Sequence, residues 1–292
     1  MTVTKAALFP ARRAHIDRDR QDRALRQVEA LTGLGAAVSS LEYLASSRDF
    51  DRGELLSWET ARTRYRWMTG RAEKVLGTFF DKPGIQGLFG LRVLAAATLM
   101  NPKASAGSKN AAATYLAATN FAVHARSPYG SDGSETVLTI SLTTLALSKA
   151  FASDPRARQA CLWFIAAQSC LSYGIAGVAK AISPVWRDGT AVRDIFRTRM
   201  FGHRFAFDFL RDRPRLSRAL GHVTIAGETL FPLVLVAPGP VARALLAVGA
   251  GFHGSNAVFM GLNRFVWAFL GTYPAIAYCA RGLGRTDRSR SD

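Results

Sequence analysis

The chain has 292 residues, of which 49% are hydrophobic and 20% charged, and its formal net charge is +17. Its basic residues flank apolar stretches instead of gathering on one polar domain, which argues against nucleic acid as a partner and favours the anionic headgroups of a lipid bilayer. The three cysteines, Cys161, Cys170 and Cys279, have no metal-ligand spacing, so we expect no metal site.

Charged residues dominate the beginning of the chain, with six arginines between Arg12 and Arg26. The apolar core that a signal peptide needs does not follow them. We therefore predict a basic cytoplasmic segment over residues 1–27, a transmembrane domain over 28–280 and a basic, disordered tail over 281–292.

Two long stretches carry no Asp, Glu, Lys or Arg: the 21 residues between Arg158 and Lys180 and the 20 residues between Arg243 and Arg264. A helix needs about 20 apolar residues to cross the bilayer core, and a soluble helix would carry charges every third or fourth residue. Together with weaker apolar stretches elsewhere in the chain, these two uncharged stretches predict an all-α, polytopic transmembrane bundle. Its spans, about eight in number, are expected over residues 28–45, 84–100, 110–124, 136–151, 159–182, 216–236, 241–262 and 265–279.

Two longer connections, 47–83 and 183–215, contain amphipathic pieces at 57–68 and 192–207, which suit helices lying in the headgroup region. A solvated loop helix is the alternative for the first piece. An even number of spans puts both ends on one side, and their basic residues predict the cytoplasmic side of the cell membrane. Both longer connections would then face outside, although each holds eight Lys and Arg residues.

Lys180 ends the longest uncharged stretch and is the leading candidate for a catalytic residue. One interpretation is a lysine that snorkels, with its stem in lipid and its ammonium group among the headgroups. The other is a lysine inside the bundle, where shelter from water favours a neutral amine that can act as a base. The sequence leaves both interpretations open.

The turn after Lys180 reads Trp-Arg-Asp-Gly, from Trp186 to Gly189, and Pro184 is expected to end the span before it. Gly189 permits a tight turn. Arg187 and Asp188 are either a surface ion pair or residues that lock this loop over a cavity.

Polar residues also occur inside the sixth and seventh predicted spans. Glu228 lies in the middle of the sixth, and an intramembrane carboxylate normally faces protein or a water-filled cavity. His253 and Asn256 are three residues apart in the seventh and so share a helix face, either to bind a ligand or to hold helices together. Arg126 and Asp132 flank a turn-rich loop and are expected to be structural.

Three segments together resemble a known family: YGIAGVAKAISPVWRDG, GETLFPLVLVAPGPVAR and FHGSNAVFMGLNRF. In order and spacing they are similar to motifs of the vitamin K-dependent gamma-carboxylases and of the wider horizontally transferred transmembrane (HTTM) domain. The first matches a Tyr-x-x-Ala-Gly-x-x-Lys…Trp-x-x-Gly pattern. The resemblance covers residues 28–280 and is strongest over 172–267.

The resemblance implies a quinone-dependent enzyme. Lys180 falls at the family's lysine, which acts as a base toward a reduced quinone, either vitamin K hydroquinone or a menaquinol-like lipid. O2 and CO2 are the implied co-substrates, and no metal is implied. Tyr173, Trp186, Arg187, Asp188, Glu228, His253 and Asn256 would line the pocket for substrate and cofactor.

One departure from the family concerns the substrate. The carboxylases continue into a large lumenal domain that grips the substrate's propeptide, and this chain stops after its last predicted span. We therefore expect a peptide or small substrate, or a soluble partner that replaces the domain. One alternative is a maturation or export factor for a secreted toxin peptide of the sporulation-delaying type. A loop of such maturation factors resembles residues 129–133. Another is a non-catalytic membrane module that binds quinone or lipid.

Overall fold

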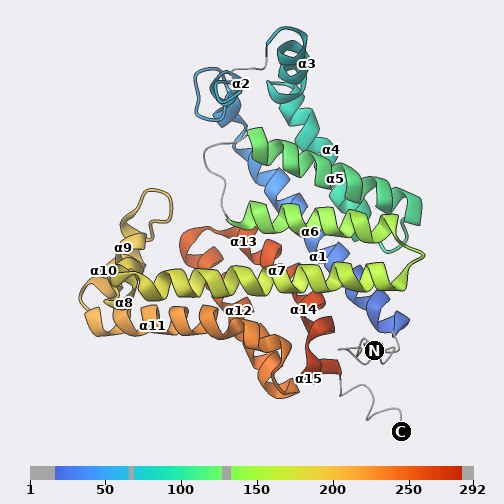
Figure 1. The fold of residues 1–292 in the computed structure, drawn as a ribbon. Helices are drawn as coiled ribbons and strands as arrows, with labels where there is room; N and C mark the ends of the chain where they lie inside the picture. Colours follow the sequence, from blue (N-terminus) through green and yellow to red (C-terminus); the bar gives the residue numbers. More distant parts are fainter. Residues whose placement is uncertain (1–16, 66–68, 127–132, 285–292) are drawn as a thin grey trace, which may run out of the picture.

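The protein is helical, with no strand in the parts of the chain that the structure describes (Figure 1). The structure is a computed structural model and describes residues 17–65, 69–126 and 133–284. The all-α prediction is therefore confirmed for these residues. The predicted loop residues 129–132, Asp132 among them, and most of the predicted tail lie outside the described residues.

Seven long helices form the bundle: α1 (Arg18–Ala45), α4 (Gly84–Met100), α5 (Ala106–Arg126), α6 (Gly133–Ala150), α7 (Pro155–Ile182), α11 (Pro214–Leu230) and α12 (Gly239–Met260). Shorter pieces connect or extend them: η1 (Ser47–Phe50), α2 (Trp58–Arg62), α3 (Arg71–Phe80), α8 (Pro184–Arg187), α9 (Thr190–Asp194), η2 (Ile195–Arg197), α10 (Arg204–Arg211), η3 (Phe231–Leu235), α13 (Asn263–Leu270), α14 (Tyr273–Cys279) and α15 (Arg281–Gly284). The stretches predicted as spans fall mainly within helices. The last of them is broken into α13 and α14.

The boundary predicted at residue 27 falls inside α1. Asp17 caps this helix by accepting a hydrogen bond from the Arg20 backbone at 2.9 Å, which satisfies one of its first N–H groups. The Arg20 side chain donates to the Ala277 carbonyl at 3.1 Å, and Gln21 donates to the Pro155 carbonyl at 2.8 Å. The charged segment from residue 18 onward therefore belongs to the bundle, and α1 begins beside the end of α14.

α7 is the central helix of the site. Asp154 accepts hydrogen bonds from the first turn of α7, and Pro155 occupies its first position, a common arrangement at helix starts. One face of α7 is buried against α6, α11 and α14. Among the described residues, α7 is the one helix long and apolar enough to cross a membrane by itself, whereas α3 and α4 meet that test only together, bent by 57°.

Ion pairs that include the buried carboxylates of Glu29 and Glu135 join the helices away from α7. The Arg264 guanidinium of α13 contacts Glu42 of α1 at 2.6 Å and Glu135 of α6 at 3.1 Å. Lys109 and Lys149 contact the two oxygens of Glu29 at 2.5 and 2.6 Å. Because an unpaired buried charge is costly, these contacts define which helices lie side by side.

Arg92 is the largest fully buried side chain of α4, and it is 1% exposed. Its guanidinium donates to the oxygens of Ser40 at 3.1 Å, Thr119 at 2.8 Å and Asn120 at 2.6 Å. These bonds connect α4 to α1 and α5. The charge inside the predicted second span thus holds three helices together.

Candidate functional site

Lys180 of α7 and Glu228 of α11 form an ion pair, with Nζ and Oε2 2.6 Å apart. The Lys180 side chain is 20% exposed and that of Glu228 is 9% exposed. The ammonium group therefore points into the bundle, toward a carboxylate, and not outward as a snorkelling lysine would. The structure brings together two residues that the sequence singled out separately.

The segment that follows Lys180 packs along α11 and so fixes the position of Lys180 against that helix. Pro184 ends α7 as expected, but α8 continues beside α11 instead of leaving it. Ser217 of α11 donates to the Gly189 carbonyl at 2.6 Å, which fixes the turn against the start of α11. At 1.5 Å per residue, Glu228 lies about 20 Å along α11 from Pro214. Lys180 lies in the last turn of α7 and Glu228 in the last turn of α11, and α8 and η3 continue the chain beyond the ion pair on the two sides.

Gly177 allows α7 and α11 to approach each other next to the ion pair. A Cβ atom on Gly177 would lie 2.4 Å from the backbone nitrogen of Thr229, a separation that real Cβ atoms do not show. Only glycine fits this contact without a shift of the backbone. Gly177 is one turn before Lys180, and Thr229 directly follows Glu228, so this contact sets the separation of the pair.

Trp186 contacts the same ammonium group from α8. The Lys180 Nζ lies 5.1 Å from the centroid of the Trp186 ring, within the range of a cation–π interaction. The ring and the Glu228 carboxylate together hold the positive charge at the end of the Lys180 side chain. This arrangement orients Nζ between the carboxylate and the aromatic ring.

A hydrogen-bonded cluster lies beside the pair. The Tyr173 hydroxyl is 2.6 Å from His253 Nε2 and 2.8 Å from the Tyr273 hydroxyl. The Tyr173 ring stacks on Phe231 with centroids 3.9 Å apart, and the His253 ring stacks on Phe269 at 4.4 Å. Since the aromatic rings hold the polar groups in place, the cluster forms a fixed polar wall within an apolar setting.

These groups line a cavity of about 630 Å³, named here the Lys180 cavity. Its lining includes six of the eight predicted site residues: Tyr173, Lys180, Trp186, Glu228, His253 and Asn256. Phe252, Met260 and Phe265 supply part of the apolar lining. The size and the few convergent polar groups are typical of a site for a small, largely apolar ligand.

Arg187 and Asp188 lie outside the Lys180 cavity, and both are exposed. The backbone N–H of Thr190 donates to Asp188 at 2.8 Å and holds the pKa of this carboxyl below its usual value. Gly189 follows with φ of 86°, the left-handed region that favours glycine. The expectation that Arg187 and Asp188 lock a loop over the cavity is replaced by a role for Asp188 in the turn before α9.

Several residues of the site were not found from the sequence. Tyr273 extends the polar cluster, and the segment of α9 and η2 forms part of the cavity wall through Val192, Ile195 and Phe196. The amphipathic pattern of this segment predicted a place at the membrane surface and gave no sign of the cavity. Arg126, expected to be structural, donates to the carbonyls of Leu56 and Phe80 at 2.6 and 3.0 Å.

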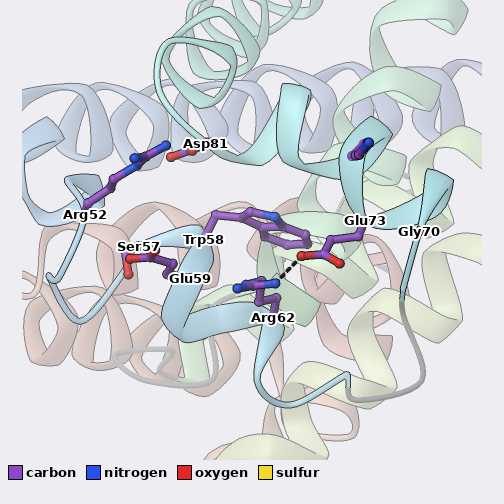
Figure 2. A pocket seen from close by; sticks show the side chains of 9 residues that line it. Arg52, Ser57, Trp58, Glu59, Arg62, Gly70, Glu73 and Asp81 are labelled. Atoms are coloured by element: carbon purple, nitrogen blue, oxygen red, sulfur yellow. Dashed lines mark hydrogen bonds and ion pairs between the residues drawn. The ribbon is translucent and has the colours of Figure 1, made fainter.

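A second, more polar cavity of about 440 Å³ lies between α2 and α3 (Figure 2). Basic and acidic side chains alternate around it, and Arg62 forms an ion pair with Glu73 across it. Trp58 supplies the main aromatic surface. None of the predicted site residues lines this second cavity, and its own charges are matched, so the Lys180 cavity is the candidate site.

Comparisons of this chain with protein-family models, with curated proteins and with solved structures find no match. The geometry of the Lys180 cavity and the motifs of the sequence therefore carry the functional inference.

Proposed function

We propose that this chain is a multi-pass enzyme of the cell membrane that uses the Lys180–Glu228 pair as a proton acceptor toward a reduced quinone, in the manner of the vitamin K-dependent gamma-carboxylases and HTTM proteins that its motifs resemble. The single observation that carries the proposal is the Lys180–Glu228 ion pair at 2.6 Å inside a mostly apolar cavity. The substrate is a peptide or small molecule, reached directly or through a soluble partner.

Exposed apolar side chains support the membrane placement. On α7, a stripe of five residues spaced three, four or seven apart is more than half exposed: Phe164, Leu171, Ile175, Val178 and Ile182. A stripe of this size facing water would be unfavourable, whereas lipid would cover it. Leu94 of α4, Phe121 of α5 and Val248 of α12 are exposed in the same way.

The contact between α1 and α14 supports an even number of crossings. Arg20, near the start of α1, donates to the Ala277 carbonyl near the end of α14, so α1 begins on the side where α14 ends. Both termini then lie on one side of the membrane, and their basic residues place that side in the cytoplasm. α1, α4, α5, α6, α7, α11 and α12 would each cross, and α13 with α14 would make the eighth crossing as a broken span.

The Lys180 cavity suits a quinone ring. Phe252, Phe265 and Phe269 offer flat apolar surface, while His253 and Asn256 offer polar groups for the ring oxygens. A reduced quinone, with O2, would supply the strong base needed to take a proton from the substrate, and CO2 would be the second substrate. The volume of the Lys180 cavity and its mixed aromatic and polar lining are the features that fit a quinone ring.

The pair moves one proton within itself. With a single shared proton, the pair is either an ammonium beside a carboxylate or a neutral amine beside a carboxylic acid, and both states have no net charge. In the second state the Lys180 amine is free to accept a proton from a hydroxyl of a ligand in the cavity. Lys180 then becomes an ammonium beside neutral Glu228, and its positive charge balances the oxyanion left on the ligand.

The test is turnover of menaquinol by the full chain in proteoliposomes. Lys180→Met keeps a long, unbranched side chain but removes the amine, and we expect menaquinol oxidation to fall by about 10²–10⁴-fold. Lys103→Met, at an exposed lysine between α4 and α5, should leave oxidation unchanged.

Two results would count against the enzyme. Equal oxidation by Lys180→Met and the parent chain would remove Lys180 from the chemistry. Menaquinone retained by the parent chain without any turnover would favour the non-catalytic quinone-binding module. Mass spectrometry of candidate peptides for an added carboxyl group would identify carboxylation, and co-purification of a small precursor peptide would favour the maturation factor.

A further inference from the structure

The segment of α9, η2 and α10, residues 190–211, has two faces with different surroundings. Its inner face supplies Val192, Ile195 and Phe196 to the wall of the Lys180 cavity. Figure 1 shows α8, α9 and α10 gathered at one end of α7 and α11, apart from the rest of the bundle. α10 packs against α9 and η2, so a contact on the outer face of α10 reaches the cavity wall through these two elements.

The outer face carries large apolar side chains. Met200 is 72% exposed and Phe205 is 70% exposed. Phe205 and Phe209 are one turn apart on α10, and their rings stack with centroids 6.3 Å apart. On the opposite side of α10, Ala206 and Leu210 are buried. α10 is thus an amphipathic helix, and the ring contacts of its aromatic side are with residues close in sequence, His203 and Arg213.

The sequence around these aromatic residues contains more arginines than acidic residues. Residues 187–218 contain nine arginines and four aspartates. The aspartates are engaged locally; Asp194, for example, accepts two hydrogen bonds from Arg193 at 2.7 and 3.0 Å. Arg197 and Arg213 lie over the rings of Phe207 and Phe209, at 5.4 and 4.1 Å from the ring centroids.

We propose that the outer face of residues 190–211 binds the headgroups of anionic phospholipids and that these lipids hold the wall of the Lys180 cavity in place. Exposed aromatic rings beside arginine are the composition that binds a membrane surface, with the rings below the phosphates and the guanidinium groups at their level. Apolar exposure continues onto the end of α12, where Val258 is 73% exposed. His203 contacts Phe259 of α12 with ring centroids 5.5 Å apart, so α10 is anchored where the apolar surface of the bundle ends.

A purely acidic soluble partner fits this face less well. It would satisfy the arginines but leave Met200, Phe205 and Phe209 facing water. A bilayer containing anionic lipid satisfies both kinds of side chain at once. The inference rests on the proposed membrane placement of the bundle and does not depend on any catalytic activity.

The experiment compares amide hydrogen exchange of residues 190–211 in the full chain, in nanodiscs of phosphatidylcholine alone and in nanodiscs that also contain phosphatidylglycerol. We expect slower exchange with phosphatidylglycerol, and loss of that protection in high salt. The variant Arg197→Gln/Arg199→Gln/Arg204→Gln should weaken the preference for phosphatidylglycerol on the order of 100-fold, since each arginine near an anionic surface contributes about fivefold.

A matched variant, Lys103→Gln/Arg156→Gln/Arg281→Gln, removes the same charge at exposed positions outside this segment and should keep the protection. Exchange in α7 must be the same in all chains, which shows that they fold. Equal exchange of residues 190–211 in both nanodiscs, or full protection in the first variant, would overturn the lipid inference alone. Failure of the chain to enter nanodiscs would overturn the membrane placement on which the proposed function also rests.

Discussion

Replacing Glu228 by glutamine destabilises the folded chain by about 3–5 kcal/mol, because it leaves the Lys180 ammonium enclosed without its carboxylate. Lys180→Met should have a similar effect, since it leaves Glu228 without its cation. The free energy of unfolding in detergent, measured by denaturant titration, tests both. The double variant Lys180→Met/Glu228→Gln should recover much of the loss, because neither charge then remains unpaired.

Two controls separate the pair from a general effect of lost charge. The exposed pair of Lys82 and Asp51, with atoms 2.7 Å apart, should lose less than about 1 kcal/mol in Lys82→Met. The exchanged variant Lys180→Glu/Glu228→Lys restores a pair and should recover stability while menaquinol turnover stays low. Additive effects in the double variant would show that Lys180 and Glu228 do not interact.

Gly177→Ala should destabilise the chain by about 1–3 kcal/mol, because the new methyl group overlaps the backbone of α11 and cannot be relieved by a side-chain rotation. The new Cβ atom would lie 2.4 Å from the backbone nitrogen of Thr229, so the overlap is with backbone and not with the end of a flexible side chain. Since this contact sets the distance from Lys180 to Glu228, ligand binding in the Lys180 cavity should weaken as well. Thermal unfolding and menaquinone retention measure the two effects.

Gly227→Ala is the matched control for Gly177→Ala. Gly227 lies on α11 next to Glu228, and a Cβ atom there would meet nothing within 4 Å. Alanine should leave stability unchanged or raise it by about 1 kcal/mol, because glycine is the poorer helix former. If the two alanine variants unfold alike, α7 and α11 are not in close contact at Gly177.

The sequence predicted the helices and the chemical residues of the site but not how they pair. Uncharged stretches mark helices because their length and spacing are local properties of the chain. Lys180 and Glu228 stood out because charges are unusual in such stretches. Their ion pair depends on the register of α7 against α11, and that register is set by the contact of Gly177 with Thr229, which no local pattern encodes.

The predictions that the structure does not support also concern contacts between helices. Of the two interpretations of Arg187 and Asp188, a surface pair or a lock over a cavity, the structure does not support the lock, because α8 continues along α11 and both residues are exposed. Tyr273 was missed because its place beside the site depends on contacts between helices, with the Tyr173 hydroxyl and the Phe231 ring. The boundary at residue 27 was drawn where the arginines end, whereas the capping by Asp17 starts the helix earlier.

The contacts of α1 with α13 and α14 join segments that are synthesised far apart in time. α1 is synthesised first, yet Glu42 and the Arg20 side chain find Arg264 and the Ala277 carbonyl only when α13 and α14 emerge from the ribosome. Until then the nascent bundle holds an acid without its cation and an open seam along α1. The contacts along α1 are therefore complete only after residues 264–277 have been synthesised, and a ribosome that stops before residue 264 leaves a product that cannot form them.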